Sequence, residues 1–343
     1  MLFTSQLFII RAGSRFIKQF SCRELSTSVL IDGKETTELI PQPDNTIQRK
    51  DSRLLKVAIL GSPNAGKSTL INKLMDRTVC PVSCKVHTTI HKAQAIYTEA
   101  NTQIVFLDTP GVVSKSEMKK YKLNSTFIKD PSASVEKADV IGIVQDVSNR
   151  YTRHKIANQV LDVLQNRRAD TPLLLIFTKV DMLKKKKVLL DLTSAFINHN
   201  SLFSFDNVFM VSGLKGDGVA DLKNYLIDLA KPSDWQYDEK SYIDQPFEKI
   251  ITDTVRAKLL DNLPEEMPYK IGVEIEYFDF TPDGSISTVV IIWCPNSHYY
   301  KVLLKKSGGR IKSIAMAAEE ELRHAFRTQV LLKLNVQTNV KID

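Results

Sequence analysis

Cysteine is scarce in this chain of 343 residues, which contains only four, at Cys22, Cys80, Cys84 and Cys294. Four cysteines are too few for a disulfide framework in a chain of this size, and they do not form the two closely spaced pairs of a four-cysteine zinc site. The six histidines show no clustering of metal ligands either. We therefore interpret the cysteines as reduced thiols, those near residue 80 as thiols of a mobile loop, and we assign no histidine a catalytic role.

Long apolar runs are also missing, because no uninterrupted stretch reaches the roughly 18 residues that a membrane-spanning helix needs. Hydrophobic residues make up 43% of the chain and charged residues 25%, which argues against wholesale disorder. The length favours two folded domains. The 47 basic and 39 acidic residues give a net charge of +8, which favours anionic partners such as nucleic acid or a membrane surface.

Acidic side chains are absent from the first 23 residues. Arg11, Arg15 and Lys18 recur there at helical spacing among apolar residues and serines, a composition typical of a mitochondrial targeting leader. A secretory signal, weakened by arginines inside its apolar part, and a plain disordered tail are the alternatives. The polar, proline-bearing segment that follows indicates a linker, so residues 1–50 are expected to be a transit peptide and linker.

The first motif is GSPNAGKS at residues 61–68, which follows the apolar run KVAIL. It matches the phosphate-binding pattern G-x-x-x-x-G-K-[ST], in which glycines expose backbone N–H groups to phosphate. Lys67 is expected to reach the β- and γ-phosphates and Ser68 to bind magnesium. A chance glycine turn is the alternative. The expected nucleotide contacts of this segment are Gly61, Asn64, Ala65, Gly66, Lys67, Ser68 and Thr69.

Two further motifs follow apolar runs. TQIVFLDTPG places Asp108 where a carboxylate can hold magnesium, and it places the backbone N–H of Gly111 where it can sense the γ-phosphate. PLLLIFTKVD ends in Thr178, Lys179 and Asp181. A carboxylate at Asp181 can accept hydrogen bonds from N1 and N2 of guanine, which adenine does not offer. The segment Ser212, Gly213 and Leu214 is expected to close over the O6 side of the base.

The set GSPNAGKSTL, CKVHTTIHK, DTPG, TKVD and SGLKGDG resembles that of the Era family of GTPases, in particular its mitochondrial branch. The resemblance covers about residues 54–340. It implies an α/β P-loop GTPase domain over residues 51–234, with a mostly parallel sheet flanked by helices, that binds GTP or GDP and Mg²⁺. The sequence departs from the family at Thr178, where asparagine is usual, and at Ile90, where arginine is usual.

Hydrolysis is expected to be slow, because Val112 follows Gly111 at the position where Ras-type switches carry a water-orienting glutamine. The resemblance implies that Asn64 could bind K⁺ beside the phosphates; a purely structural role for Asn64 is the alternative. Thr88 or Thr89 is expected to complete the magnesium shell. The residues expected to support catalysis are Lys67, Asn64, Gly111 and Thr89.

A second module begins after the polar stretch KPSDWQYDEKSYIDQP. The pattern predicts a helix at 246–263, strands at 269–280 and 285–295, a helix-like segment at 302–306, a helix at 311–326 and a last strand at 330–338. This order resembles the type II KH domain of Era, a small α+β fold that binds RNA. We assign it to residues 235–343.

The RNA contact of such a module lies at a G-x-x-G loop, where this chain has Lys305, Lys306, Ser307 and Gly308, so the first glycine is missing. Five basic residues without an acid occupy residues 301–312, which favours RNA over the alternative of a solvated helix end. The lysine run at 184–187 is expected to be a solvated helix face, with RNA contact the less favoured interpretation. The expected RNA-binding residues are Lys301, Lys305, Lys306, Ser307, Gly308, Gly309, Arg310 and Lys312.

These patterns predict a GTPase of the mitochondrial matrix that binds small-subunit mitochondrial rRNA and times assembly of the small ribosomal subunit. Peripheral association with the inner membrane is an open expectation, and no obligate oligomer is expected. An RNA chaperone with a structural GTPase fold and a tRNA-modification GTPase are the alternatives.

Overall fold

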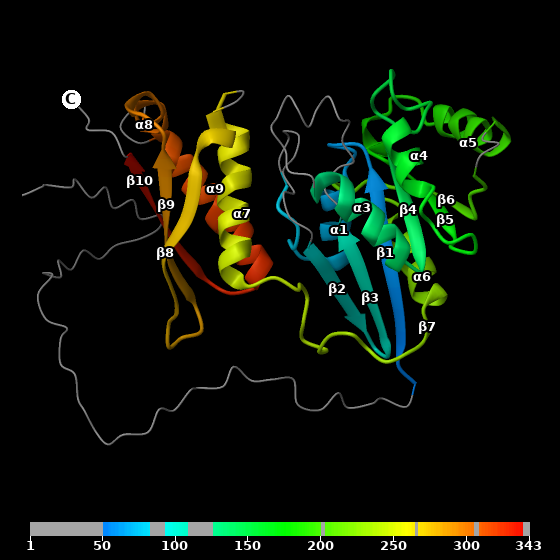
Figure 1. Ribbon diagram of the computed structural model, residues 1–343, viewed down its shortest axis with the longest axis horizontal. Helices are drawn as coiled ribbons and strands as arrows, with labels where there is room; N and C mark the ends of the chain where they lie inside the picture. Colours follow the sequence, from blue (N-terminus) through cyan, green and yellow to red (C-terminus); the bar gives the residue numbers. More distant parts are fainter. Residues whose placement is uncertain are drawn as a thin grey trace, which may run out of the picture.

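The computed structural model describes residues 51–82, 93–108, 126–199, 203–264, 267–304 and 309–338. Within these ranges the chain builds two sheets, one of strands β1 to β7 and one of strands β8 to β10 (Figure 1). This confirms the predicted class, an α/β domain with a mostly parallel sheet followed by a small α+β fold.

The first sheet has the strand order β2-β3-β1-β4-β5-β6, and the short β7 pairs with the start of β1. Strands β1, β3, β4, β5 and β6 are parallel, whereas β2 is an antiparallel edge strand. The strands are β1 (Arg53–Gly61), β2 (Ala93–Glu99), β3 (Thr102–Asp108), β4 (Val140–Asp146), β5 (Leu173–Thr178), β6 (Asn207–Met210) and β7 (Lys231–Pro232).

Helices cover both faces of this sheet, which is why its central strands read as continuous apolar runs rather than alternating ones. Helices α1 and α6 pack on one face, and α3, α4 and α5 lie on the other (Figure 1). The helices are α1 (Lys67–Met75), α3 (Thr126–Lys137), α4 (Asn158–Leu164), α5 (Lys187–His199) and α6 (Val219–Leu229), with a 3₁₀ turn at Val180–Met182. Cys80 is 1% exposed and belongs to this core, so its interpretation as a mobile-loop thiol is wrong.

The second sheet has the order β10-β9-β8, and helices α7 and α9 pack on it around a shared apolar core. The predicted order of helix, two strands, two helices and strand is confirmed. The elements are α7 (Phe247–Asn262), a 3₁₀ turn (Met267–Lys270), β8 (Gly272–Phe280), β9 (Ile286–Cys294), α8 (Ser297–Leu303), α9 (Gly309–Phe326) and β10 (Val330–Thr338). No helix in the described part of the chain is long and apolar enough to cross a membrane.

Helix α8 begins five residues before the helix-like segment that the sequence predicted at 302–306. Its start is fixed by Asn296, whose side chain accepts a hydrogen bond from the backbone N–H of Tyr299 at 3.2 Å. Asparagine is a preferred residue at this capping position because its side-chain oxygen satisfies an N–H that the helix cannot.

The segment between the two sheets runs along the edge strand β2. The N–H of Ile96 donates to the carbonyl of Tyr242 at 3.0 Å, and the N–H of Asp244 donates to the carbonyl of Gln94 at 3.1 Å. The guanidinium of Arg77 lies over the Tyr242 ring, 3.8 Å from its centroid. The connection is therefore attached to the first sheet.

A second contact joins the end of α9 to the loop that follows α1. The backbone N–H of Thr78 donates to Nδ1 of His324 at 3.2 Å, and Arg327 donates to the carbonyl of Asp76 at 3.3 Å. Along the chain, the residues Asp76 and Thr78 that make these contacts precede residues 83–92, and strand β2 follows them.

Candidate functional site

The predicted nucleotide motifs follow strands β1, β3, β5 and β6 of the first sheet. Because parallel strands end at the same edge of a sheet, the loops that follow them meet there. Gly61 ends β1, Asp108 ends β3 and Thr178 ends β5, while Ser212 lies two residues after β6. The described parts of four separate motifs are thus gathered at one edge.

The loop between β1 and α1 requires its glycines. A Cβ atom at Gly61 would lie 2.6 Å from the carbonyl oxygen of Val144 in β4, closer than backbone atoms allow. Gly66 has φ +95° at the N-terminus of α1, a left-handed conformation that favours glycine. The loop turns sharply and directs the N-terminus of α1 toward the site, an arrangement that suits an anion.

Lys67 lies at the start of α1 and is only 6% exposed. Its ammonium group donates hydrogen bonds to the carbonyls of Gly61 at 3.2 Å and Ser62 at 3.0 Å. A buried ammonium group needs acceptors, and here the loop itself provides two of them. These hydrogen bonds place the Lys67 ammonium group beside the backbone of the loop that is expected to hold phosphate.

Thr178 connects the guanine motif to the phosphate-binding loop. Its hydroxyl donates to the carbonyl of Ala65 at 2.6 Å, and the side chain is 2% exposed. The threonine hydroxyl therefore ties the end of β5 to the loop after β1, although asparagine is usual at this position in the family that the sequence resembles. The departure preserves a hydrogen bond between the two motifs.

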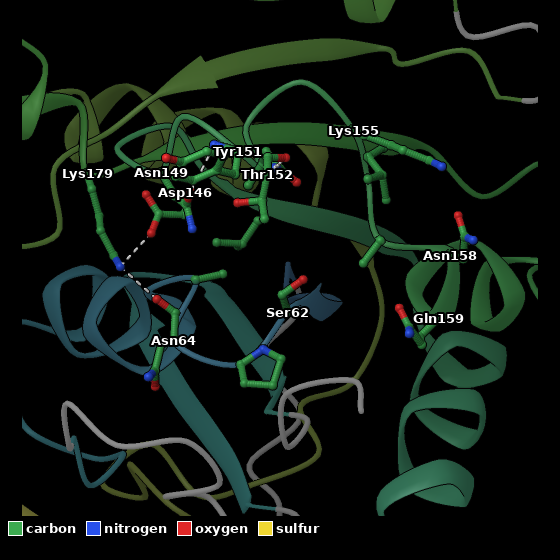
Figure 2. Close-up of a pocket in the computed structure, with 16 residues that line it drawn as sticks. Ser62, Asn64, Asp146, Asn149, Tyr151, Thr152, Lys155, Asn158, Gln159 and Lys179 are labelled. Carbon is green, nitrogen blue, oxygen red and sulfur yellow. Dashed lines mark hydrogen bonds and ion pairs between the residues drawn. The ribbon is translucent and has the colours of Figure 1, made fainter. Parts of the chain in front are cut away.

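Lys179 extends along the same loop. Its ammonium group donates to the carbonyl of Asn64 at 2.8 Å and forms an ion pair with Asp146 Oδ2 at 2.7 Å (Figure 2). Asn64 itself has φ +58°, a conformation that asparagine tolerates better than most residues. The ammonium group of Lys179 therefore holds the backbone of the phosphate-binding loop at Asn64.

Asp181 is oriented by the loop after β6. Its Oδ1 accepts a hydrogen bond from the hydroxyl of Ser212 at 2.7 Å, and that hydroxyl accepts one from the N–H of Lys215 at 3.0 Å. Gly213 packs against the side chain of Thr69, whereas Leu214 is 78% exposed. The carboxylate expected to read guanine is therefore fixed in orientation by a buried serine.

Two residues that are expected to bind magnesium, Ser68 and Asp108, lie at described backbone positions. Ser68 is the second residue of α1. Asp108 pairs in register with Ile59 of β1, and Ile59 lies two residues before Gly61. Hydroxyl and carboxylate oxygens are the donor types that Mg²⁺ prefers. The described residues contain no group of three or more histidine, cysteine or acidic side chains that could hold a metal ion by themselves. Gly111, Thr88 and Thr89 lie outside the described residues.

The expected RNA surface of the second fold is described in part. Lys301 is exposed at the end of α8, Lys312 is exposed on α9, and Arg310 donates to the carbonyl of Val302 at 3.3 Å, which ties the two helices together. Gly309 begins α9. Lys305, Lys306, Ser307 and Gly308 lie outside the described residues. A hollow of about 730 Å³ lies beside the α9 residues Gly309, Lys312, Ser313, Met316, Ala317, Glu319, Glu320 and Arg323.

Sequence reasoning missed two positions at the first site, Gln145 and Asp146, which end β4. Asp146 pairs with Lys179, and the side chain of Gln145 donates to the carbonyl of Thr152 at 2.9 Å. A weak signal is present, because the apolar run VIGIV is followed by Gln145 and then by the acid Asp146, whereas the run before Asp108 is followed by the acid directly. No motif pattern includes this strand end, so the sequence alone does not predict its role.

Comparison with known families agrees with this geometry. The family described as 50S ribosome-binding GTPase matches residues 56–179. The mitochondrial GTPase Era of Danio rerio is 34% identical over 351 aligned residues, covering 87% of this chain and 78% of that protein. That of Salmo salar is 32% identical, covering 90% of this chain and 81% of that protein.

Two solved structures match both folds. One is Era in complex with MgGDPNP and nucleotides 1506–1542 of 16S ribosomal RNA, with a TM-score of 0.69 and 25% identity, covering 84% of this chain and 94% of that one. The other is Aquifex aeolicus Era bound to GDP and AlF₄⁻, with a TM-score of 0.70 and 25% identity, covering 83% and 94%.

Proposed function

Because the chain belongs to the Era family of GTPases, enzymes that bind and hydrolyse GTP, we propose that it binds the small-subunit rRNA of mitochondria and times assembly of that subunit by its nucleotide state. One observation carries the proposal: a nucleotide site and a KH-like fold with a basic surface occur in a single chain, in the arrangement of the Era structure that holds MgGDPNP and rRNA. We assign the GTPase domain to residues 51–234 and the KH-like domain to residues 235–343.

The nucleotide site supports defined roles for its residues. The N–H groups of the loop Gly61–Gly66 and the ammonium of Lys67 would hold the phosphates, and Asp181 would accept hydrogen bonds from guanine. Ser68 and Asp108 would hold Mg²⁺, with Thr88 or Thr89. The ion neutralises the charge that develops on the phosphate oxygens during transfer.

Asn64 is proposed to contribute to a K⁺ site beside the phosphates. Its carbonyl already accepts from Lys179 and its backbone is left-handed, so the side chain is presented by a constrained loop. GTP turnover in potassium buffer should exceed turnover in sodium buffer, and Asn64→Ala should remove the difference. Equal rates in the two buffers would exclude the role.

RNA binding is proposed for the basic surface of the KH-like domain. Lys301, Arg310 and Lys312 lie on two helices that a hydrogen bond joins, and the segment 305–308 between those helices adds two lysines. Clustered cations attract the phosphate backbone, and this contact weakens as salt rises.

Location in the mitochondrial matrix is proposed from the acid-free leader and from the mitochondrial relatives. Peripheral association with the inner membrane is a further part of the proposal. Fractionation of mitochondria should place the protein in the matrix, with a membrane-bound share that high salt releases. Recovery only outside mitochondria would contradict it.

RNA crosslinking in intact mitochondria tests the function. A discrete segment of small-subunit rRNA should be recovered, its yield should change with Lys67→Ala, and it should be lost when Lys301, Arg310 and Lys312 are neutralised together. Recovery of tRNA alone would instead support a tRNA-modification GTPase. Recovery of rRNA that is unaffected by Lys67→Ala would support an RNA chaperone with a structural GTPase fold.

A further inference from the structure

A basic loop with an exposed aromatic ring joins β4 to α4, far along the chain from the KH-like domain. Its sequence is NRYTRHK, at residues 149–155, and no acid occurs between Asp146 and Asp162. The Tyr151 side chain is 97% exposed, and Arg150 and Lys155 are exposed beside it. A large aromatic side chain left in solvent among cations is a recognisable feature of surfaces that bind nucleic acid.

The loop is held in one conformation by its own hydrogen bonds. Asn149 Oδ1 accepts from the N–H of Tyr151 at 3.0 Å, and the Asn149 carbonyl accepts from the N–H of Arg153 at 3.0 Å. The buried Gln145 donates to the carbonyl of Thr152 at 2.9 Å. The loop that carries the aromatic ring and the cations is therefore already ordered. Binding does not have to offset the entropy cost of ordering it.

A hollow of about 470 Å³ opens next to this loop (Figure 2). Amide side chains of Asn149, Asn158 and Gln159 line it, and amides both donate and accept hydrogen bonds. In Figure 2 the amides of Asn158 and Gln159 lie across the hollow from Asp146 and Lys179. Asp146 is the one acid among the described lining residues, and its ion pair with Lys179 at 2.7 Å neutralises it.

The hollow adjoins the proposed nucleotide site and shares Asn64, Ala65 and Lys179 with it. It shares the outer side of the loop Ser62–Ala65, but Lys67, Ser68 and Asp181 do not line it. A ligand in the hollow would lie against the wall of the phosphate-binding loop and could be bound together with GTP.

We propose that this loop and hollow bind single-stranded RNA. One base stacks on Tyr151, the edge of a base lies in the hollow against the amides of Asn158 and Gln159, and the phosphates contact Arg150 and Lys155. Amides that both donate and accept match the edges of bases, whereas an acidic peptide or a lipid headgroup would require only the cations. A duplex hides its base faces, so single strands fit this surface better. The inference rests on the proposed binding of rRNA and adds a second contact on the GTPase domain.

The test uses the full chain and fluorescein-labelled single-stranded RNA of about 10 nucleotides, with a duplex of equal length for comparison. Tyr151→Ala should weaken binding of the single strand about tenfold, within the range measured for loss of one stacked base. It should leave duplex binding, GTP affinity and the urea midpoint unchanged. Ultraviolet crosslinking should place RNA on the peptide that contains Tyr151.

A second experiment tests the role of the cations by comparing the salt dependence of RNA binding in two triple variants. Neutralising Arg150, Arg153 and Lys155 to glutamine should lower the slope of log affinity against log salt by about 1.4, because each of the two proposed phosphate contacts, at Arg150 and Lys155, contributes about 0.7 for single strands. The matched control neutralises Lys184, Lys185 and Lys186, which removes the same charge from the segment that precedes α5. That control should change the slope by less than half as much, by the same counterion argument.

The outcomes separate this site from the KH-like surface. The inference would be overturned if Tyr151→Ala left the affinity for single-stranded RNA unchanged and no crosslink fell in residues 149–159. Equal changes of the salt slope in the two triple variants would also overturn it. Binding of anionic vesicles that depends on Arg150 and Lys155, without any RNA effect, would also overturn it. If neutralising Lys301, Arg310 and Lys312 abolishes RNA binding while the loop variants do not affect it, the proposed function stands and this second contact fails.

Discussion

The hydroxyl of Thr178 joins the guanine motif to the phosphate-binding loop. It donates to the Ala65 carbonyl at 2.6 Å inside a buried site, beside the more exposed hydrogen bond from Lys179 to the Asn64 carbonyl. A hydrogen bond needs only a donor at the right position, which is why threonine can stand where asparagine is usual.

Thr178→Val removes this donor while keeping the shape of the side chain. The buried Ala65 carbonyl then loses a partner, so the free energy of unfolding should fall by about 1–3 kcal/mol. The Kd for GTP should rise as well, because the loop is less constrained. Urea unfolding and GTP titration check both effects. Thr178→Ser keeps the hydroxyl as the control, and a valine variant as stable as the wild type would contradict the account.

Asp181 is the proposed reader of guanine, held by Ser212 at 2.7 Å. Asp181→Asn replaces an acceptor by an amide, so GTP should bind at least about tenfold more weakly, the effect of losing a charge-assisted hydrogen bond. The amide can donate to the 2-oxo group of xanthine, so xanthosine triphosphate should bind the variant better than the wild type. Calorimetric titration with both nucleotides measures this. Asp221→Asn on α6 is the control, and unchanged GTP preference in Asp181→Asn would remove the residue from the site.

Cys294 illustrates how burial controls reactivity. Burial raises the pKa of its thiol to about 11, so near pH 8 it should carry roughly two orders of magnitude less thiolate than an ordinary cysteine. Iodoacetamide should therefore label Cys294 far more slowly in the folded protein than in urea, and the folded rate should rise as pH approaches 11. The pKa of the Cys294 thiol is higher in the folded than in the unfolded state. Its contribution to the free energy of unfolding is therefore fully present below about pH 8.5 and is lost as the pH rises toward 11. Peptide mass spectrometry follows the label, and equal rates in the two states would refute the assignment.

At the scale of elements, the connecting segment is bound to the edge of the first sheet. Residues Tyr242–Asp244 bond to Gln94–Ile96 on β2, and the Tyr242 ring covers the guanidinium of Arg77. An edge strand exposes backbone groups that need partners, and the connection supplies them here.

Tyr242→Ala should lower the free energy of unfolding by about 1–3 kcal/mol, since a partly buried ring and its cation–π contact are lost together. Tyr242→Phe retains the ring and should cost less than about 0.5 kcal/mol. Hydrogen exchange at the N–H of Ile96 should accelerate in the alanine variant only. If the two variants lose equal stability, the ring does not hold the connection.

The elements differ in how far the sequence could predict them. Apolar runs and glycine loops predicted β1, β3, β5 and the edge where they meet, because buried parallel strands and phosphate loops have strong local patterns. The start of α8 depends on one capping asparagine, and the role of Asp146 depends on Lys179, which follows β5, so neither has a local pattern. The burial of Cys80 was also missed, since its backbone is held by the side chain of Asn72 on α1 and its thiol packs in the core.

At the scale of the whole molecule, contacts between the described parts of the two folds lie on both sides of residues 83–92 along the chain. On one side Thr78 contacts α9 and Asp76 contacts the residue that follows α9, and on the other side Gln94 and Ile96 contact the connecting segment. The segment between them carries Thr88 and Thr89, the proposed magnesium ligands. A change in that segment with the state of the nucleotide would therefore act next to both contacts with the KH-like domain.

The most direct test of the account is the affinity of the full chain for mitochondrial small-subunit rRNA in two nucleotide states. We expect the affinity with a non-hydrolysable GTP analogue to differ from that with GDP by about tenfold or more, which corresponds to about 1.4 kcal/mol of coupling. Lys67→Ala, which removes the proposed phosphate contact, should abolish the difference. Equal affinity in the two states, measured where both nucleotides saturate the protein, would contradict a nucleotide-timed assembly factor.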